Sequence, residues 1–455
     1  MTDTTKTSRN PFAGAMRPVN AVVERFIPSA LVFAVLLTFV VAALALLLTD
    51  AGPTAVLTGW GDGLSGLLEF MTQMALVLLL GHMLANTRLV RRGLARVSAL
   101  PRGPLQAYVF VAVLASALSL VQWGLGLVAG GLLAREVAAQ MRAKGVRVHF
   151  PLLVAAGFSG FVVWHMGYTG SGPLTAATAD SFVVEQLGET ISVAETTFAP
   201  WNMVAALVTV VVVAGALALV APRGTDRIVE LDVDAREAEV EVERPVTPAD
   251  RLDASRVLTT LTGLGLVAYL VVYFAGGGTP TLDIVNWTFL ALVFLLVRSP
   301  FEVAALVKNA ATNVGDILLQ FPLYAGILGI MTATGLIQIF SDAIVSVSTP
   351  QTFGVLAFVA AGVVNFFVPS GGGQFAVQAP ILLDAATQVG VDPSVAIMAV
   401  AYGDQWTNMI QPFWALPLLA IAGLKVRDIL GYTTVTLLAS GIVFAATLLI
   451  VGPGA

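Results

Sequence analysis

The sequence contains no cysteine, only three histidines and few charged residues. Without cysteine there is no disulfide, thiolate metal site or thiol nucleophile, and His82, His149 and His165 leave little material for a zinc site. Charged residues make up 11% of the 455 residues, less than half of the roughly 25% typical of soluble proteins. Hydrophobic residues make up 57%, and the mean hydropathy is +0.88. This composition predicts an integral membrane protein built from helices, and it excludes a soluble enzyme or a nucleic-acid binder.

Two further kinds of machinery have little support. None of the lysines (Lys6, Lys144, Lys308, Lys425) follows the glycine-rich pattern of a phosphate-binding loop, so no ATP-driven pump is encoded. The run 157–160 has the G-x-S-G pattern of intramembrane serine proteases. In a regular helix, however, His165 would lie about 9 Å along the axis from Ser159 and about 240° around it. An intramembrane hydrolase is therefore only a weak alternative.

Long apolar segments predict the membrane spans. A transmembrane helix needs about 20 mostly apolar residues. The first segment follows 26 residues and is too long for a signal-peptide core, so we interpret it as a retained anchor. Two more apolar stretches, 104–139 and 352–388, are interrupted by glycine and polar residues, and each is either a pair of spans or a re-entrant hairpin. Nine segments meet the length requirement: 27–48, 64–85, 150–172, 199–221, 257–275, 282–298, 316–340, 393–422 and 428–451.

The placement of charge predicts the orientation. With the N-terminus in the cytoplasm, the inside loops collect all 23 Lys and Arg residues, as the positive-inside rule requires. The outside loops hold only acids: Asp50, Asp62, Asp180, Glu185, Glu189, Glu195, Asp283, Asp342, Asp384 and Asp392. The C-terminus is then outside. Hairpins and paired spans leave the loops on the same sides, so charge does not distinguish between them.

The order of segments predicts an inverted repeat. We expect a cytoplasmic tail (1–26), a first membrane repeat (27–221), a charged cytoplasmic linker (222–256), and a linking span followed by a second repeat (257–455). Each repeat reads span, span, hairpin, span, span, and the extra crossing at 257–275 inverts the second. Such repeats are typical of secondary transporters. The expected fold is an all-α polytopic membrane protein with about nine full spans, two re-entrant helical hairpins and two interrupted helices.

Four polar clusters at membrane depth supply the candidate substrate residues. Broken helices survive there only inside protein or beside a water-filled cavity, and the N-terminus of a half-helix favours an anion. The glycines after Ser370 leave room for a carboxylate to approach the backbone. The candidate substrate-binding residues are Ser119, Gln122, Trp123, Asn365, Ser370, Gly371, Gly372, Gly373, Gln374, Trp406, Thr407, Asn408 and Gln411.

Asp404 is the leading candidate for coupling to an ion, because carboxylates within the membrane are costly and usually functional. His165 is the second candidate, although one hydrogen bond would satisfy it as a structural residue. Thr169 and Ser171 complete the set for a coupling ion or proton. No metal site is certain, although Na⁺ near Asp404 fits the surrounding oxygens. The packing interpretation is favoured for the indoles of Trp123, Trp164 and Trp406, and for the pair Gly130-Gly131.

Two long motifs in the second half carry a family resemblance. The runs 365–374 (NFFVPSGGGQ) and 403–417 (GDQWTNMIQPFWALP) resemble the bacterial short-chain fatty acid transporters, which are acetoacetate and butyrate uptake permeases. The likeness extends to Trp164-His165 and to 170–174 in the first half. The family is similar to a wider ion-transporter superfamily that includes dicarboxylate carriers. The resemblance implies a homodimer in the bacterial inner membrane, with a scaffold part and a part that moves as an elevator.

The expected function is uptake of short-chain monocarboxylates with H⁺ or Na⁺, with no enzymatic activity, no cofactor and no nucleic-acid partner. An anion moving toward a negative interior costs about 2.3 kcal/mol per 100 mV, so entry of a cation with it is expected. An anion channel is the main alternative, but a channel usually has a repeated ring of pore residues. The cation, the chain length and the direction of transport stay open.

Overall fold

The computed structural model describes residues 30–222, 228–231, 247–312, 314–365, 370–411 and 414–452, and within these ranges every regular element is helical. The expected all-α architecture is therefore confirmed. The first half comprises α3 (Ala30–Leu48), α4 (Pro53–Gly63), α5 (Leu68–Asn86), α6 (Arg88–Val97), α7 (Pro104–Val121), α8 (Trp123–Ala143), α9 (Phe150–Ser159), the 3₁₀ helix η1 (Gly160–Met166), α10 (Ser171–Ala177), α11 (Phe182–Leu187) and α12 (Pro200–Leu219). The second half comprises α13 (Pro248–Asp253), α14 (Arg256–Ala275), α15 (Leu282–Leu296), α16 (Pro300–Ala311), α17 (Gly315–Thr334), α18 (Leu336–Val347), α19 (Phe353–Asn365), α20 (Gly371–Val389), α21 (Pro393–Thr407), α22 (Ala415–Ala422) and α23 (Val426–Val451).

Six helical segments in the described ranges are long and apolar enough to cross a membrane: α5, α7, the run α9–η1–α10, α12, α14 and α23. A seventh is gained if the bent pair α17–α18 counts as one span. The span expected at 316–340 is not one continuous helix, because the chain bends by 87° between α17 and α18. Gly335, with φ of +74°, lies at the bend in the left-handed region that glycine adopts without strain. The expected segment 393–422 is interrupted after Thr407.

The stretch 104–139 forms a hairpin, in which α7 and α8 pack side by side and the chain reverses at Gln122. Close approach of the two helices requires Gly126, because a Cβ there would lie 2.5 Å from Cα and 2.6 Å from N of Ser119. Further along α8, a Cβ on Gly130 would lie 2.8 Å from the carbonyl oxygen of Gly157 on α9. Glycine therefore serves helix packing in this region, as expected for Gly130.

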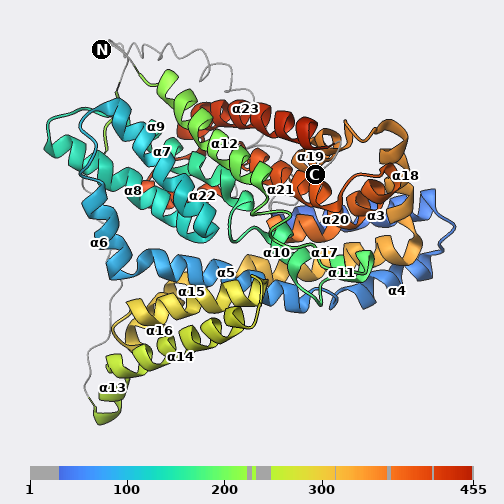
Figure 1. Ribbon diagram of the computed structural model, residues 1–455, viewed down its shortest axis with the longest axis horizontal. Helices are drawn as coiled ribbons and strands as arrows, with labels where there is room; N and C mark the ends of the chain where they lie inside the picture. The colour runs from blue at the N-terminus through green and yellow to red at the C-terminus, as the bar shows by residue number, and fades with distance from the viewer. Residues whose placement is uncertain are drawn as a thin grey trace, which may run out of the picture.

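The first helices of each membrane repeat pack against the other half of the chain. In Figure 1, α3 and α4 (blue) lie beside α17, while α15 and α16 (yellow) lie against α5 of the first half. The contact between α4 and α17 is close, since a Cβ on Gly329 would lie 2.9 Å from Cα of Gly63. The last long helices of the halves, α12 and α23, pack against each other. Each half thus depends on the other for its packing.

The charged segment 222–256 falls partly outside the described residues, which lack 223–227 and 232–246. The described residues 228–231 lie at the start of α9. The backbone N–H of Val229 donates to Nδ1 of His149 at 3.1 Å, and its carbonyl accepts from the N–H of Phe150 at 2.7 Å. Glu230 also forms an ion pair with Arg147. The start of the linker is therefore fixed to the first half.

Candidate functional site

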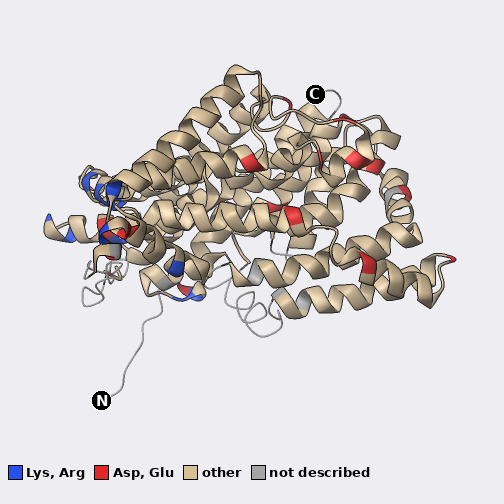
Figure 2. Cartoon of the chain, turned by 90° about the horizontal axis from the view of Figure 1, so that it is seen from below, with Lys and Arg blue, Asp and Glu red and all other residues tan. Residues whose placement is uncertain are grey.

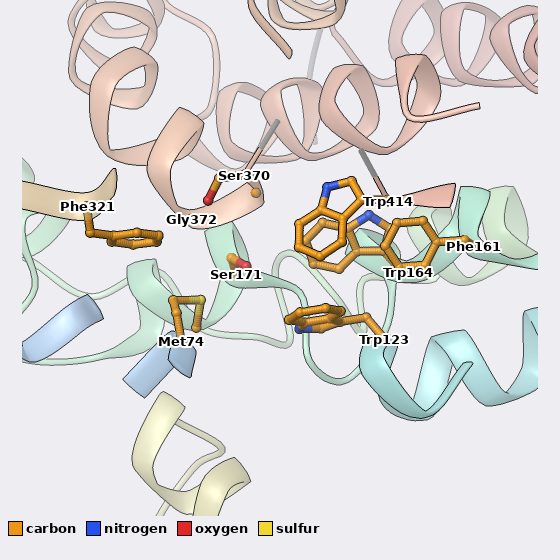
Figure 3. Close-up of a pocket in the computed structure, with 10 residues that line it drawn as sticks. Met74, Trp123, Phe161, Trp164, Ser171, Phe321, Ser370, Gly372 and Trp414 are labelled. Carbon is orange, nitrogen blue, oxygen red and sulfur yellow. The ribbon is translucent and has the colours of Figure 1, made fainter. Parts of the chain in front are cut away.

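The interrupted helices of both halves surround a small cavity (Figure 3). Its free volume is about 20 Å³, room for a single water molecule. The described lining residues are Met74 of α5, Trp123 of α8, Phe161 and Trp164 of η1, Ser171 of α10, Phe321 of α17, Ser370, Gly371 and Gly372 at the start of α20, and Trp414 before α22. The candidates Trp123, Ser171, Ser370, Gly371 and Gly372 therefore come together.

The N-terminus of α20 forms one wall of the cavity. Ser370 caps the helix, and its Oγ accepts the N–H of Gly373 at 3.2 Å. The N–H groups of Gly371 and Gly372 belong to the first turn, where a helix has no internal acceptors for them. A Cβ on Gly371 would lie 2.7 Å from Cζ2 of Trp164, and one on Gly372 would lie 2.9 Å from Cζ of Phe70. Only glycine leaves space for these rings against the helix end.

Aromatic rings form the opposite wall. The ring centroids of Trp123 and Trp414 are 5.2 Å apart, and those of Phe161 and Trp164 are 5.7 Å apart in a stacked arrangement. The buried indole N–H groups of Trp123 and Trp164 have no hydrogen-bond partner among the described residues. Buried donors are normally paired, so two unpaired donors on rings that line the cavity are unusual. The cavity therefore combines an apolar surface with several free N–H donors.

A buried ionisable pair lies directly behind Trp164. Nδ1 of His165 is 3.0 Å from Oδ2 of Asp404, and both side chains are 0% exposed. The His165 ring stacks on Trp164, with centroids 4.1 Å apart. Its Cε1 atom would be 3.3 Å from a Cβ on Gly371. The two coupling candidates, 239 residues apart in the sequence, are thus in contact and adjacent to the start of α20.

Asn365 ties the second hairpin to the interrupted helix that carries Asp404. Its Nδ2 lies 2.8 Å from the Asp404 carbonyl, 3.0 Å from Oγ1 of Thr407 and 2.8 Å from Oδ1 of Asn408. On the other side of α21, Oε1 of Gln405 accepts the backbone N–H of His165 at 3.0 Å. These bonds satisfy groups that the break in α21 leaves exposed, and they connect α19, α21 and η1.

The first-half candidates at the hairpin tip mainly satisfy the backbone. Gln122 caps α8 by accepting the N–H of Leu125, and its Nε2 donates to the Val77 carbonyl of α5 at 2.7 Å. Oγ1 of Thr169 accepts the N–H of Trp123 at 3.1 Å. Ser119 is buried against Gly126. These residues fix the position of the Trp123 ring at the cavity.

Asn365, Gly373, Thr407 and Asn408 do not line the cavity, and three further second-half candidates also lie outside its lining. The indole of Trp406 donates to the Leu437 carbonyl at 2.7 Å and packs on Phe358. The Gln374 side chain faces α19, where its Nε2 donates to the Ala361 carbonyl at 2.8 Å. Gln411 is buried just after the break in α21. Conversely, the sequence analysis did not identify Met74, Phe161, Phe321 or Trp414, of which only Trp414 lies in a recognised motif.

The serine of the G-x-S-G run does not meet a histidine. Oγ of Ser159 is 2.7 Å from Oγ1 of Thr436, whereas the nearby His165 ring bonds to Asp404 and to the N–H of Gly172. This arrangement lacks the nucleophile and base contact that a serine hydrolase needs.

The fold is that of membrane transporters. The YdaH transporter of Alcanivorax borkumensis superposes with a TM-score of 0.58 at 16% identity, covering 92% of this chain and 98% of that one. MtrF of Neisseria gonorrhoeae, described within a class of antimetabolite efflux pumps, gives 0.54 at 17% identity, covering 95% and 97%.

The sequence comparisons define the family. The family model of the short chain fatty acid transporter matches residues 14–451. Two relatives carry the name "Putative short-chain fatty acid transporter". The Escherichia coli protein is 38% identical over 427 residues, covering 93% of this chain and 96% of its own. The Haemophilus influenzae protein is 34% identical over 440 residues, covering 94% and 96%. The chain belongs to the short-chain fatty acid transporter family, as the sequence motifs predicted.

Proposed function

We propose that this protein takes up short-chain monocarboxylates, of the butyrate and acetoacetate type, together with H⁺ or Na⁺. The observation that carries the proposal is the cavity at the start of α20. The N–H groups of Gly371 and Gly372 and the hydroxyl of Ser370 suit a carboxylate, and the partial positive charge of the helix end favours it. The rings of Trp123 and Phe161 suit a short alkyl chain. One polar end and one apolar wall match the two parts of the substrate.

Binding requires rearrangement, because the free volume of about 20 Å³ is smaller than any carboxylic acid. Rotation of the aromatic rings or movement of the second hairpin would open the site. In the proposed elevator, the cavity would pass from one side of the membrane to the other with the moving part of a homodimer. The remaining substrate candidates, including Asn365 and Gln374, then act by holding the hairpins in place.

The proposed membrane topology is nine full spans and two re-entrant hairpins, in two repeats of opposite orientation with the N-terminus inside and the C-terminus outside. The exchange of first helices between halves supports the repeat, because α3 and α4 contact α17 as α15 and α16 contact α5. Figure 2 supports the orientation: the described Lys and Arg residues gather at one end of the molecule, while Asp and Glu lie mostly elsewhere. The charged end would face the cytoplasm of a bacterial inner membrane.

Labelled butyrate counterflow in proteoliposomes tests the proposed function. A carrier preloaded with unlabelled butyrate should transiently concentrate the labelled acid, and excess acetoacetate should compete. An anion channel would instead give flux that neither saturates nor shows counterflow. Efflux as the physiological direction would appear as faster transport from the compartment facing Arg88 and Lys144 to the opposite compartment.

Single cysteines on this naturally cysteine-free chain test the topology. A cysteine at Thr190 should react with an impermeant maleimide from outside, and one at Val229 only after the membrane is opened. Labelling of position 190 solely from inside would overturn the orientation and the inverted repeat together.

A further inference from the structure

The hydrogen bonds of His165 define its protonation state. The backbone N–H of Gly172 lies 2.9 Å from Nε2 of His165. A backbone N–H can only donate, so Nε2 must present its lone pair. The ring is therefore neutral, with its proton on Nδ1, and Nδ1 donates to Oδ2 of Asp404 at 3.0 Å. The basic nitrogen of the pair, Nε2, thus accepts one hydrogen bond, from the backbone N–H of Gly172.

The Asp404 carboxylate has little compensation for its charge. It is fully buried, and its Oδ1 has no hydrogen-bond partner among the described residues. Described ionisable side chains on the elements packed around η1 and α20 are Tyr108, Arg135, Glu136, Arg142, Glu185, Tyr324, Asp342, Asp384, Tyr402 and Asp404. Of these, Asp404 is the one recorded in contact with His165. Tyr402 instead donates to Asn202, and Arg135 donates to the carbonyl of Ile421.

A second anion beside this carboxylate would be costly, because buried charge is tolerated only when it is paired. The substrate carboxylate at Gly371 would lie next to His165, whose Cε1 faces that glycine. A cation must therefore enter with the substrate. The imidazole already occupies Oδ2, and imidazole is a poor partner for Na⁺, which prefers several oxygen ligands. A proton, in contrast, needs only the lone pair of Nε2 to bind.

Two neighbours of the ring, Asp404 and Trp164, would interact with a protonated imidazole. Protonation of Nε2 would convert the hydrogen bond to Asp404 into a contact ion pair, which is stronger than a neutral bond. The imidazolium would stack on Trp164, whose π face attracts a cation. Gly172 would lose its acceptor, and Gly172 follows Ser171, which lines the cavity. Proton binding would therefore change the substrate cavity directly.

We propose, on the basis of the proposed function, that the His165–Asp404 pair binds the co-transported ion and that this ion is a proton. External water supplies the proton to Nε2 when a carboxylate binds at α20. The proton and the substrate carboxylate are both released to the cytoplasm, and the neutral ring with its Nδ1 proton is restored. The empty and loaded carriers then bear the same charge, so one proton crosses per carboxylate and the exchange is electrically silent.

Proteoliposomes containing a pH-sensitive dye test this proposal in sodium-free buffer. Acetoacetate uptake by the unaltered protein should acidify the interior by one proton per acid, after subtraction of the rate in protein-free liposomes. A potassium diffusion potential should leave the rate unchanged. Asp404→Asn removes the buried charge, so it should keep some counterflow of labelled acetoacetate but lose the acidification and the accumulation driven by a pH gradient. His165→Gln leaves the Asp404 carboxylate uncompensated beside the substrate and should lose all three. His82→Gln, at a histidine away from the cavity, is the matched control and should retain all of them.

The outcomes separate the two proposals. Absence of counterflow in the unaltered protein would overturn the proposed function. Counterflow with uptake that requires Na⁺, or normal acidification by both variants, would overturn the proton assignment and leave the function standing. If Asp404→Asn does not fold, His165→Gln decides: acidification at the unaltered rate by that variant would overturn the proton assignment, and its loss while His82→Gln keeps it would support the assignment.

Discussion

The two hairpins occupy matching places in their halves but differ at their tips. In the first, Gln122 caps α8 and also bonds to Val77 of α5, so the turn is fastened to its own half. In the second, Ser370 caps α20, and the following glycines pack against Phe70 and Trp164 of the first half. The first tip is thus anchored by a side-chain hydrogen bond to α5, whereas the described start of α20 packs on apolar rings of the first half. Under the proposed function, this difference would give the first hairpin a supporting role and the second hairpin the larger role in binding.

The interrupted helices show a similar division. In the first half, η1 places Trp164 at the cavity and His165 behind it. In the second half, the end of α21 supplies Asp404, and several polar atoms near it lack partners among the described residues: Oδ1 of Asn365, Oε1 of Gln374, Oδ1 of Asp404, Nε2 of Gln405 and Nδ2 of Asn408. Unpaired buried polar atoms are unusual in a part that serves only the fold. Among the described residues, the unpaired side-chain amide and carboxylate atoms therefore lie in the second half.

The largest expected effect comes from crowding the contact between the two helices of the first hairpin. Gly126→Ala places a Cβ 2.5 Å from Cα and 2.6 Å from N of Ser119, and backbone atoms cannot move aside as a flexible side chain would. Overpacking of this kind typically costs about 1–3 kcal/mol or more. We expect little folded protein, measured as the monodisperse fraction in detergent. Normal yield would mean that α7 and α8 do not approach this closely.

The second effect separates folding from transport. Gly372→Leu puts a side chain against Phe70 and Met74, whose nearest atoms would lie 2.9 Å and 3.2 Å from the Cβ. These are ends of side chains, so the protein should still fold, while the cavity fills and uptake is lost. Gly265→Leu is the matched control, because a Cβ there meets nothing within 4 Å. Normal uptake by Gly372→Leu would remove the start of α20 from the site.

The sequence predicted the breaks well but not what surrounds them. Glycine and polar residues at membrane depth identified the tips at Gln122 and Ser370, because a membrane helix cannot lose its backbone bonds without compensation. Asp404 was conspicuous for a similar reason, since it is an acid in an apolar segment. The bend at Gly335 was missed, because a single glycine is common within straight membrane helices.

Cavity residues without polar atoms gave no signal. Met74 and Phe321 lie in apolar helices. In such helices the sequence does not distinguish a side chain that lines a cavity from one that packs in the core. The contact between His165 and Asp404 joins residues 239 positions apart, which no local pattern reveals. Each was a candidate separately, and only the fold made them a pair.

An intermediate effect should follow removal of the first tip's anchor. Gln122→Ala leaves the Val77 carbonyl and the Leu125 N–H without their side-chain partner, and each unsatisfied buried group costs about 1–3 kcal/mol. The melting temperature in detergent should fall, with a smaller change in the KM for butyrate. Gln106→Ala is the control, because that side chain also accepts a backbone N–H but is exposed. A large KM change without loss of stability would place Gln122 in substrate binding.

The smallest effect is expected at Gly124, the first-hairpin glycine nearest the tip. A Cβ there would lie 3.3 Å from Oε1 and 3.5 Å from Nε2 of Gln122, and 3.6 Å from the Leu78 carbonyl. These contacts are close to ordinary, and alanine is a better helix former than glycine by about 1 kcal/mol, so the two terms nearly cancel. Gly124→Ala should therefore transport butyrate within about twofold of the unaltered protein, whereas Gly372→Ala should not. Equal loss of uptake in both variants would show that substrate passes both tips, and the division between a supporting and a binding hairpin would fail.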